Sequence, residues 1–229
     1  MAFTHGIKQI VTNGLVLALD AGNPRSYPGS GTTWNNLVGS NSGTLTNGPT
    51  FSTSGGGSIV FDGIDDAVVL GTPANINSTY CTVSVWIYPT DLSNTELHFQ
   101  RSNTRANTVR LRHRISGTSV YSFTITNNSN TLVELSTTSY TPVTNEWVMI
   151  TGTYDGTTMK LYINDTFNNS TSLSGTIDTT NYSSVTVGNN SGYSASHEGN
   201  MAAITYYNRA LSASEVLQNY NAIKPRFGL

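Results

Sequence analysis

Cysteine and charged residues are both scarce in this chain. Only 10% of its 229 residues are charged, and the formal net charge is −2. This balance argues against a nucleic acid or an anionic membrane surface as a partner of the whole molecule. The single cysteine, Cys81, excludes a disulfide within the chain. It stands in an apolar run, which predicts a buried and unreactive thiol.

Long apolar runs are also missing. No stretch approaches the roughly 20 apolar residues of a membrane-spanning helix. Residues 1–8 lack the basic start and the apolar core of a signal peptide. We therefore expect a protein that is made and folded in a cytoplasm and has no membrane partner.

Short β-branched and aromatic runs, separated by turn residues, make up most of the sequence. The clearest pair flanks Asp155-Gly156, a dipeptide that tolerates the positive φ angles of a tight hairpin turn. Apolar residues recur there at every second position, at Val148, Ile150, Leu161 and Ile163. Because a two-stranded ribbon is only marginally stable alone, this apolar face must pack on another sheet.

Further strands are expected at roughly ten-residue spacing, which is typical of a sandwich or jelly roll. We predict a second hairpin from 58–62 and 67–70, and a meander over 97–136. The long connection 23–57 is anchored by Trp34. The pattern predicts an all-β fold, a two-sheet antiparallel jelly-roll sandwich.

One short helix is expected near the end of the chain. Ser212 and Glu215 have the spacing of a capping box, and Leu211 is placed to pack on Val216. The helix should run to about Asn221, followed by an extended tail. We predict an N-terminal arm at 1–13, one domain at 14–221 and a C-terminal tail at 222–229.

Several motifs in order along the chain point to a known family. Segments 58–66, Thr82-Val-Ser-Val-Trp-Ile-Tyr-Pro89, 147–164 and 201–216 resemble the laminin-G-like branch of the concanavalin A-like lectin/glucanase superfamily. The resemblance covers roughly residues 15–221 and implies a jelly-roll sandwich with a closing helix. This fold hosts sugar binding, protein binding, hydrolysis and scaffolding, so it leaves the function open.

A narrower similarity concerns segments 15–23, 26–34 and 43–51 and the Arg226-Phe-Gly228 tail. They are similar to laminin-G-like proteins of tailed bacteriophages. That similarity implies a homo-oligomeric virion component on the capsid or tail, made in the cytoplasm of a host bacterium.

Catalysis is not expected. Glycosidases use two carboxylates, about 5–5.5 Å apart in retaining and about 6.5–9.5 Å apart in inverting enzymes. The glutamates are each isolated from another strand-facing acid, and no Glu-x-Asp-x-Glu signature of the related glucanases is present: Glu96, Glu134, Glu146, Glu198 and Glu215.

Calcium is an open alternative, since many laminin-G-like domains bind one Ca²⁺ ion. Asp62, Asp65 and Asp66 are the best local supply of oxygen ligands, with Asp20 as a companion. The other interpretation is that these aspartates form Asx-turns.

Two segments are candidate ligand-binding surfaces. Arg110, Arg112 and Arg114 share one strand face and could grip an acidic glycan or an acidic neighbouring subunit, or simply form a solvated outer face. The lack of interleaved aromatic residues argues against single-stranded nucleic acid. A neutral sugar could instead meet the loop residues Asn189, Asn190, Tyr193 and His197. Trp86 and Trp147 are interpreted as core residues.

The sequence therefore favours a non-catalytic virion surface protein, a decoration protein or adhesin that binds bacterial-surface carbohydrate. The alternative is a capsid cement protein that binds only other virion proteins. A glycan hydrolase is the third hypothesis.

Overall fold

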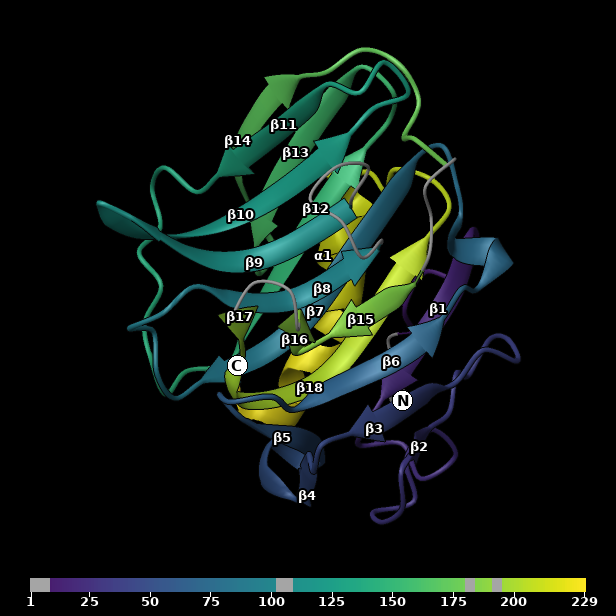
Figure 1. Cartoon of the computed structure of the whole chain (residues 1–229), viewed down its shortest axis with the longest axis vertical. Helices are drawn as coiled ribbons and strands as arrows, with labels where there is room; N and C mark the ends of the chain where they lie inside the picture. The colour runs from purple at the N-terminus through teal and green to yellow at the C-terminus, as the bar shows by residue number, and fades with distance from the viewer. Residues whose placement is uncertain (1–8, 102–108, 180–183, 191–194) are drawn as a thin grey trace, which may run out of the picture.

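The computed structural model describes residues 9–101, 109–179, 184–190 and 195–229. Two antiparallel eight-stranded sheets stack face to face, as the sequence predicts (Figure 1). The front sheet lies toward the viewer in Figure 1 and the back sheet lies behind it. None of the described helices is long and apolar enough to cross a membrane.

The back sheet has seven strands in hydrogen-bonded order, and β1 (Leu15–Asp20) also pairs with its β18 strand. The order is β14 (Thr166–Ser172), β13 (Thr158–Ile163), β12 (Val148–Tyr154), β7 (Cys81–Pro89), β18 (Glu198–Tyr207), β5 (Ser58–Asp62) and β4 (Thr50–Ser52).

The front sheet contains the predicted meander, two further strands, and two short strands from the long N-terminal connection. Its order is β11 (Leu132–Ser136), β10 (Thr118–Thr126), β9 (Val109–Ser116), β8 (Glu96–Arg101), β15 (Val185–Val187), β6 (Ala67–Gly71), β3 (Gly43–Thr46) and β2 (Thr33–Trp34). A separate small ribbon joins β16 (Asn189–Asn190) to β17 (Ala195–Ser196).

The hairpin around Asp155-Gly156 is confirmed. β12 pairs with β13, and Ile150 lies opposite Ile163. Gly156 has φ 95°, and the Asp155 Oδ1 atom accepts hydrogen bonds from the backbone N–H groups of Thr157 and Thr158. The turn therefore forms from local chemistry, and the apolar face of the hairpin packs into the core between the sheets.

The second predicted hairpin is wrong. β5 belongs to the back sheet and β6 to the front sheet, so residues 63–66 cross from one sheet to the other. Alternation of apolar residues reports the buried face of a strand but not its partner. Both strands bury apolar side chains in the same core, Phe61 from β5 and Val68 from β6.

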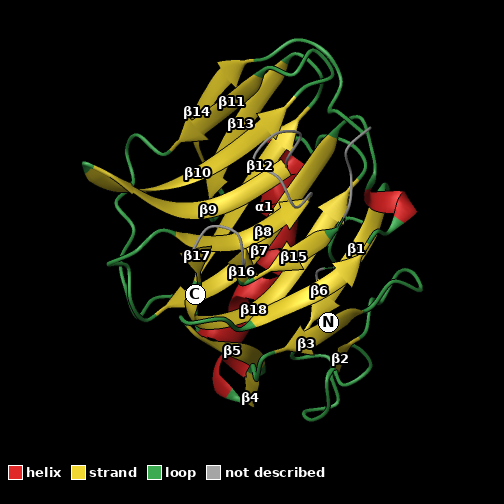
Figure 2. Cartoon of the chain, in the orientation of Figure 1, coloured by secondary structure: helices red, strands yellow, loops and turns green. Residues whose placement is uncertain are grey.

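A single α-helix, α1 (Ala213–Ile223), lies among the described residues and covers the outer face of the back sheet (Figure 2). Val216 and Tyr220 from the helix pack with Trp86, Met149 and Tyr162 of the sheet. Trp86 and Tyr220 stack with ring centroids 5.5 Å apart. Within the described part of the chain, no such helix covers the outer face of the front sheet.

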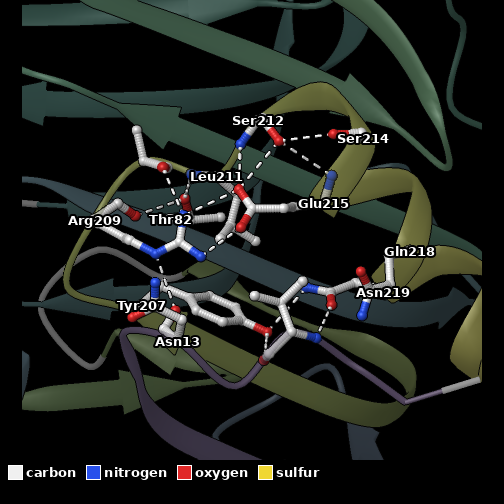
Figure 3. A network of polar contacts seen from close by, with 12 residues as sticks. Asn13, Thr82, Tyr207, Arg209, Leu211, Ser212, Ser214, Glu215, Gln218 and Asn219 are labelled. Atoms are coloured by element: carbon white, nitrogen blue, oxygen red, sulfur yellow. Dashed lines mark hydrogen bonds and ion pairs between the residues drawn. The ribbon is translucent and has the colours of Figure 1, made fainter.

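The capping box at the start of α1 is present (Figure 3). The Ser212 hydroxyl accepts from the Glu215 backbone N–H at 3.3 Å, and the Glu215 carboxylate accepts from the Ser212 N–H at 2.9 Å. The predicted staple residues Leu211 and Val216 share one apolar cluster.

The residues after α1 do not form the extended tail that the sequence predicts. They continue as the short 3-10 helix η3 (Lys224–Phe227), with Phe227 packed 4.6 Å from Trp86 between ring centroids. Two other short 3-10 helices are η1 (Ser54–Gly56) and η2 (Ala74–Ile76). The domain boundaries at residues 13 and 221 stay a prediction.

Candidate functional site

A pocket of about 540 Å³ opens where the end of β7, the start of β12, the β13–β14 turn and η3 meet. We call it the aromatic pocket. Its lining residues are Tyr88, Tyr140, Asn145, Glu146, Trp147, Asn164, Phe227 and Leu229.

Three aromatic side chains of the pocket support one another. The Trp147 ring centroid lies 4.3 Å from that of Phe227 in a stacked arrangement and 5.5 Å from that of Tyr88. All three side chains are half-buried. Each side chain is therefore partly covered by its neighbours and partly accessible, so the pocket presents apolar aromatic surface to solvent.

Two asparagines sit in the left-handed conformation at turns beside these rings. Asn145 has φ 64° and donates its backbone N–H to the Pro89 carbonyl at 2.8 Å. Asn164 has φ 57°, and its Oδ1 atom accepts from the Met149 N–H at 2.9 Å. Asparagine tolerates this conformation better than most residues. The backbone of Asn145 is therefore fixed at the rim, and the hydrogen bond to Met149 also holds the side-chain amide of Asn164.

Hydroxyl and carboxylate groups complete the rim. Burial raises the pKa of the Tyr140 hydroxyl, and the Glu146 carboxylate raises it further. Tyr140 therefore remains a protonated hydrogen-bond donor well above neutral pH. Apolar rings next to a few polar groups are the usual lining of a small-molecule site.

The sequence pattern does not predict the aromatic pocket, and it places Trp147 in the core. Trp86 is 1% exposed, as predicted, but Trp147 is half-buried and lines the pocket. The available signal was Pro89, which ends β7 beside the start of its antiparallel partner β12. The contribution of Phe227 had no signal in the sequence.

The three arginines of β9 lie at alternate positions opposite Val120, Ser122 and Thr124 of β10. They do not form a row of free guanidinium groups. The two Glu134 carboxylate oxygens accept from Arg112 Nη2 at 2.7 Å and from Arg114 Nη1 at 3.4 Å. Arg110 is buried, with 6% of its surface exposed.

Glu134 is held as a carboxylate by these contacts. Burial pushes its pKa upward, but hydrogen bonds from Ser122 and Arg112 and the charges of Arg112 and Arg114 outweigh that effect and lower it. The positive charge of Arg112 and Arg114, which was predicted to bind an acidic ligand, is thus partly neutralised by Glu134 within the sheet.

The aspartates at 62, 65 and 66 do lie together, with one carboxylate oxygen from each within 4.8 Å of the others. Asp62 Oδ1 accepts from the Ile64 N–H at 2.8 Å, and Asp66 Oδ2 accepts from the Asp62 N–H at 3.0 Å. Burial raises the pKa of Asp66, and the neighbouring charges of Asp62 and Asp65 add to the rise. Both the Asx-turn and a cation site are compatible with this geometry.

Asp20 does not join that cluster. Its Oδ1 atom accepts from the Gly22 N–H at 2.9 Å and from Arg226 Nη1 at 2.5 Å. Asp20 therefore fixes η3 to the turn after β1 rather than acting as a companion ligand.

Two of the four residues predicted to bind a sugar, Asn189 and His197, are buried. Asn189 is 7% exposed, and its Nδ2 atom donates to Ser196 Oγ at 3.0 Å. His197 is fully buried, and its Nδ1 atom lies 2.7 Å from Glu96 Oε2. These two side chains cannot contact an external sugar as they stand. Tyr193 and the side chain of Asn190 lie outside the described residues.

A second pocket, of about 280 Å³, brings acids together from both sheets. It is lined by Gly63, Ile64, Asp91, Asn94, Glu96, Ser196 and Glu198, and we call it the acidic pocket. The prediction that every glutamate is isolated from another strand-facing acid is therefore wrong for Glu96 of β8 and Glu198 of β18.

Solved structures similar to the chain share its fold. Domain 4 of AbnA, a GH43 extracellular arabinanase from Geobacillus stearothermophilus in complex with arabinotriose, has a TM-score of 0.71 at 17% identity, covering 90% of this chain and 98% of that one. The binding domain of Paraclostridial Mosquitocidal Protein 1 has a TM-score of 0.68 at 16% identity, covering 91% and 52%. Trypanosoma rangeli sialidase in complex with sialic acid has a TM-score of 0.67 at 14% identity, covering 94% and 34%.

The chain thus spans about half of the mosquitocidal domain structure and a third of the sialidase. No curated protein matches its sequence. A family model described as the concanavalin A-like lectin/glucanases superfamily matches residues 61–217. This match covers most of the two-sheet sandwich, and the chain belongs to that superfamily.

Proposed function

We propose that this protein is a non-catalytic carbohydrate-binding module whose ligand occupies the aromatic pocket. The observation that carries the proposal is the combination of half-buried aromatic rings with amide, hydroxyl and carboxylate groups in one open pocket. A sugar ring has an apolar face of C–H groups and a rim of hydroxyls. The rings would stack on the former and the polar groups would hydrogen-bond the latter.

The arabinotriose complex of the arabinanase domain supports this class of ligand. Arabinotriose is a neutral sugar, as the chemistry of the aromatic pocket favours. The arginine face of β9 is the competing surface and would select acidic glycans instead. Its two accessible guanidinium groups are shared with Glu134, which favours the aromatic pocket.

We further propose that the protein is a surface component of a tailed bacteriophage and binds bacterial-surface glycans. The similarity of segments 15–23, 26–34 and 43–51 to phage laminin-G-like proteins supports it. A capsid cement protein, with only virion proteins as partners, is the outcome that a complete absence of glycan binding would favour.

The absence of catalysis belongs to the same proposal. The acidic pocket is lined by Asp91, Glu96 and Glu198. If the protein hydrolysed glycosidic bonds, these carboxylates would be the candidate catalytic groups. Glu96 Oε2 is held by His197 Nδ1 at 2.7 Å, an arrangement that ties up one of the carboxylates. Release of reducing sugar from bound glycans, lost in Glu198→Gln, would overturn this part.

Calcium at Asp62, Asp65 and Asp66 is a further part of the proposal. The carboxylates lie close enough to share one ion, and their mutual repulsion would be relieved by it. Two of their oxygens already accept backbone hydrogen bonds, so the remaining ligands would have to be water or carbonyl oxygens.

A glycan array of neutral and acidic bacterial-surface glycans, with and without Ca²⁺, tests the function. We expect the wild type to bind neutral glycans and the Tyr88→Ala variant to lose this binding. Tyr80→Ala is the matched control, because Tyr80 is an exposed aromatic residue (39% exposed) at the opposite end of β7. The Tyr80→Ala variant should bind neutral glycans as tightly as the wild type does.

The arginine face is tested on the same array. Arg112→Ala/Arg114→Ala should leave neutral-glycan binding intact, and Arg25→Ala serves as a control for the loss of a surface arginine because Arg25 is exposed elsewhere on the molecule. Selective binding of acidic glycans that is lost only in the double variant would transfer the site to β9. A blank array for the wild type would reject the carbohydrate-binding proposal.

A further inference from the structure

A cluster of metal-ligating side chains lies at the buried end of the acidic pocket and plays no part in the proposed function. It consists of Glu96, His98 and His197, and one ligand atom from each lies within 4.8 Å of the others. Glu96 is 2% exposed and both histidines are fully buried. The cluster joins the two sheets, because β8 belongs to the front sheet and His197 immediately precedes β18 of the back sheet.

An irregularity in β8 turns His98 toward the cluster. The register with β9 shifts between Leu97 and Phe99, so that His98 is an extra residue in the strand. Such a bulge re-aims a side chain and is over-represented beside functional sites. All six residues of β8 are buried, and His98 is fully so.

The backbone of His197 is fixed on both sides. Its N–H donates to the Gly188 carbonyl at 2.7 Å, and its carbonyl accepts from the Gly63 N–H at 3.0 Å. Its ring packs edge-on to His98, with centroids 5.2 Å apart. The surrounding structure therefore holds the two imidazole rings in a defined relative geometry.

Several polar atoms of this cluster have no partner among the described residues. Neither ring nitrogen of His98 makes a hydrogen bond, and Nε2 of His197 makes none. Buried polar groups are nearly always satisfied, and one that is not needs an explanation such as a water or an ion. By contrast, both ring nitrogens of the neighbouring His113 are bonded, to the Asn94 carbonyl and to Ser119 Oγ.

We propose that Glu96, His98 and His197 bind one divalent transition-metal ion of the zinc class. His98 and His197 supply two imidazole nitrogens, and the Glu96 carboxylate supplies an oxygen. This mixed nitrogen and oxygen set suits zinc and its neighbours, whereas calcium and magnesium prefer oxygen ligands only. The site is thus chemically distinct from the aspartate cluster at 62, 65 and 66.

The protonation state and the access path agree with this assignment. Burial lowers the pKa of His98 well below its usual value, and the nearby His197 and His113 lower it further. His98 is therefore neutral, as a metal ligand must be. Because Glu96 also lines the acidic pocket, that pocket gives an ion a route to the cluster. Three protein ligands leave a coordination position for water.

Metal binding to the untagged full chain tests the proposal. After removal of metals with a chelator, the protein is titrated with Zn²⁺ by calorimetry and with Co²⁺ by visible absorption. We expect one ion per chain, d–d bands from Co²⁺ with nitrogen ligands, and a rise in Tm with Zn²⁺. A wild type that takes up neither ion would overturn the proposal.

Three variants separate a ligand role from a packing role. His98→Gln should lose the one-to-one binding transition and the Co²⁺ bands. His113→Gln, which replaces a buried histidine on the neighbouring strand β9, should keep both. Asp62→Asn/Asp65→Asn/Asp66→Asn should also keep both. Zn²⁺ binding by His98→Gln as tight as that of the wild type contradicts the assignment, and the result is independent of glycan binding.

Discussion

At the scale of single residues, the clearest electrostatic contact is the pair formed by Arg209 and Glu215 (Figure 3). The two terminal guanidinium nitrogens, Nη1 and Nη2, donate to the carboxylate at 3.0 Å and 2.6 Å. The hydrogen bonding from Arg209 lowers the pKa of Glu215 from 4.5 to about 2, with smaller contributions from Ser212. Glu215 therefore stabilises the folded state only while it is ionised.

The pH dependence of stability follows from this shift. A carboxyl group whose pKa is lowered on folding contributes its stability above the unfolded value of 4.5 and loses it as the pH falls toward about 2. In urea unfolding, the advantage of the wild type over Glu215→Gln should be full at pH 6 and shrink progressively between pH 4.5 and 2. An advantage that does not change with pH would contradict the prediction.

The Ser212 cap gives a second prediction at this scale. Ser212→Ala removes the acceptor for the Glu215 N–H and should lower the free energy of unfolding by about 1 kcal/mol. Leu217→Ala is the control, since its side chain is 41% exposed and lies beyond the first turn. Equal, small losses in both variants would show that the cap contributes nothing.

At the scale of secondary-structure elements, local chemistry was readable and pairing between distant strands was not. The turn at Asp155-Gly156 and the helix cap at Ser212 each depend on contacts within a few residues. The hairpin and the start of the helix could therefore be predicted from the sequence. The segments β5 and β6 look like a hairpin because only Gly63 to Asp66 separate them, yet they enter different sheets. Which sheet a strand joins depends on packing across the whole core.

The contact between the two sheets can be tested at Gly152 of β12. A Cβ atom there would lie 2.4 Å from the ring of Phe123 on β10, which is fully buried. Gly152→Ala should therefore lower the free energy of unfolding by roughly 1–3 kcal/mol through overpacking. Combining it with Phe123→Leu should recover part of that loss in a double-mutant cycle. Purely additive losses would mean that the sheets do not meet at this point.

At the scale of the whole molecule, the candidate sites depend on the fold more than on any motif. The aromatic pocket draws on β7, the residues before β12, the β13–β14 turn and η3, which lie far apart in the chain. The buried cluster likewise joins β8 to the residue before β18. The sequence could supply Asp62, Asp65 and Asp66 as a group because they are close neighbours. It could not place Phe227 beside Trp147, since that contact needs α1 to be docked first.

The three tryptophans differ in exposure, so ligand binding in the aromatic pocket can be followed by fluorescence. Trp34 and Trp86 are 0% and 1% exposed, whereas Trp147 is half-buried and lines the aromatic pocket. A ligand that enters the pocket should therefore change the emission of Trp147 and leave the other two unaffected. Trp147→Phe keeps an aromatic ring in place while removing the signal.

The most direct measurement is a fluorescence titration of the wild type and Trp147→Phe with arabinotriose and with the neutral glycans retained on the array. We expect a saturable change in emission in the wild type that is absent in Trp147→Phe, together with calorimetric binding that weakens in Tyr88→Ala but not in Tyr80→Ala. Saturable glycan binding by calorimetry with no change in tryptophan emission would place the ligand outside the aromatic pocket.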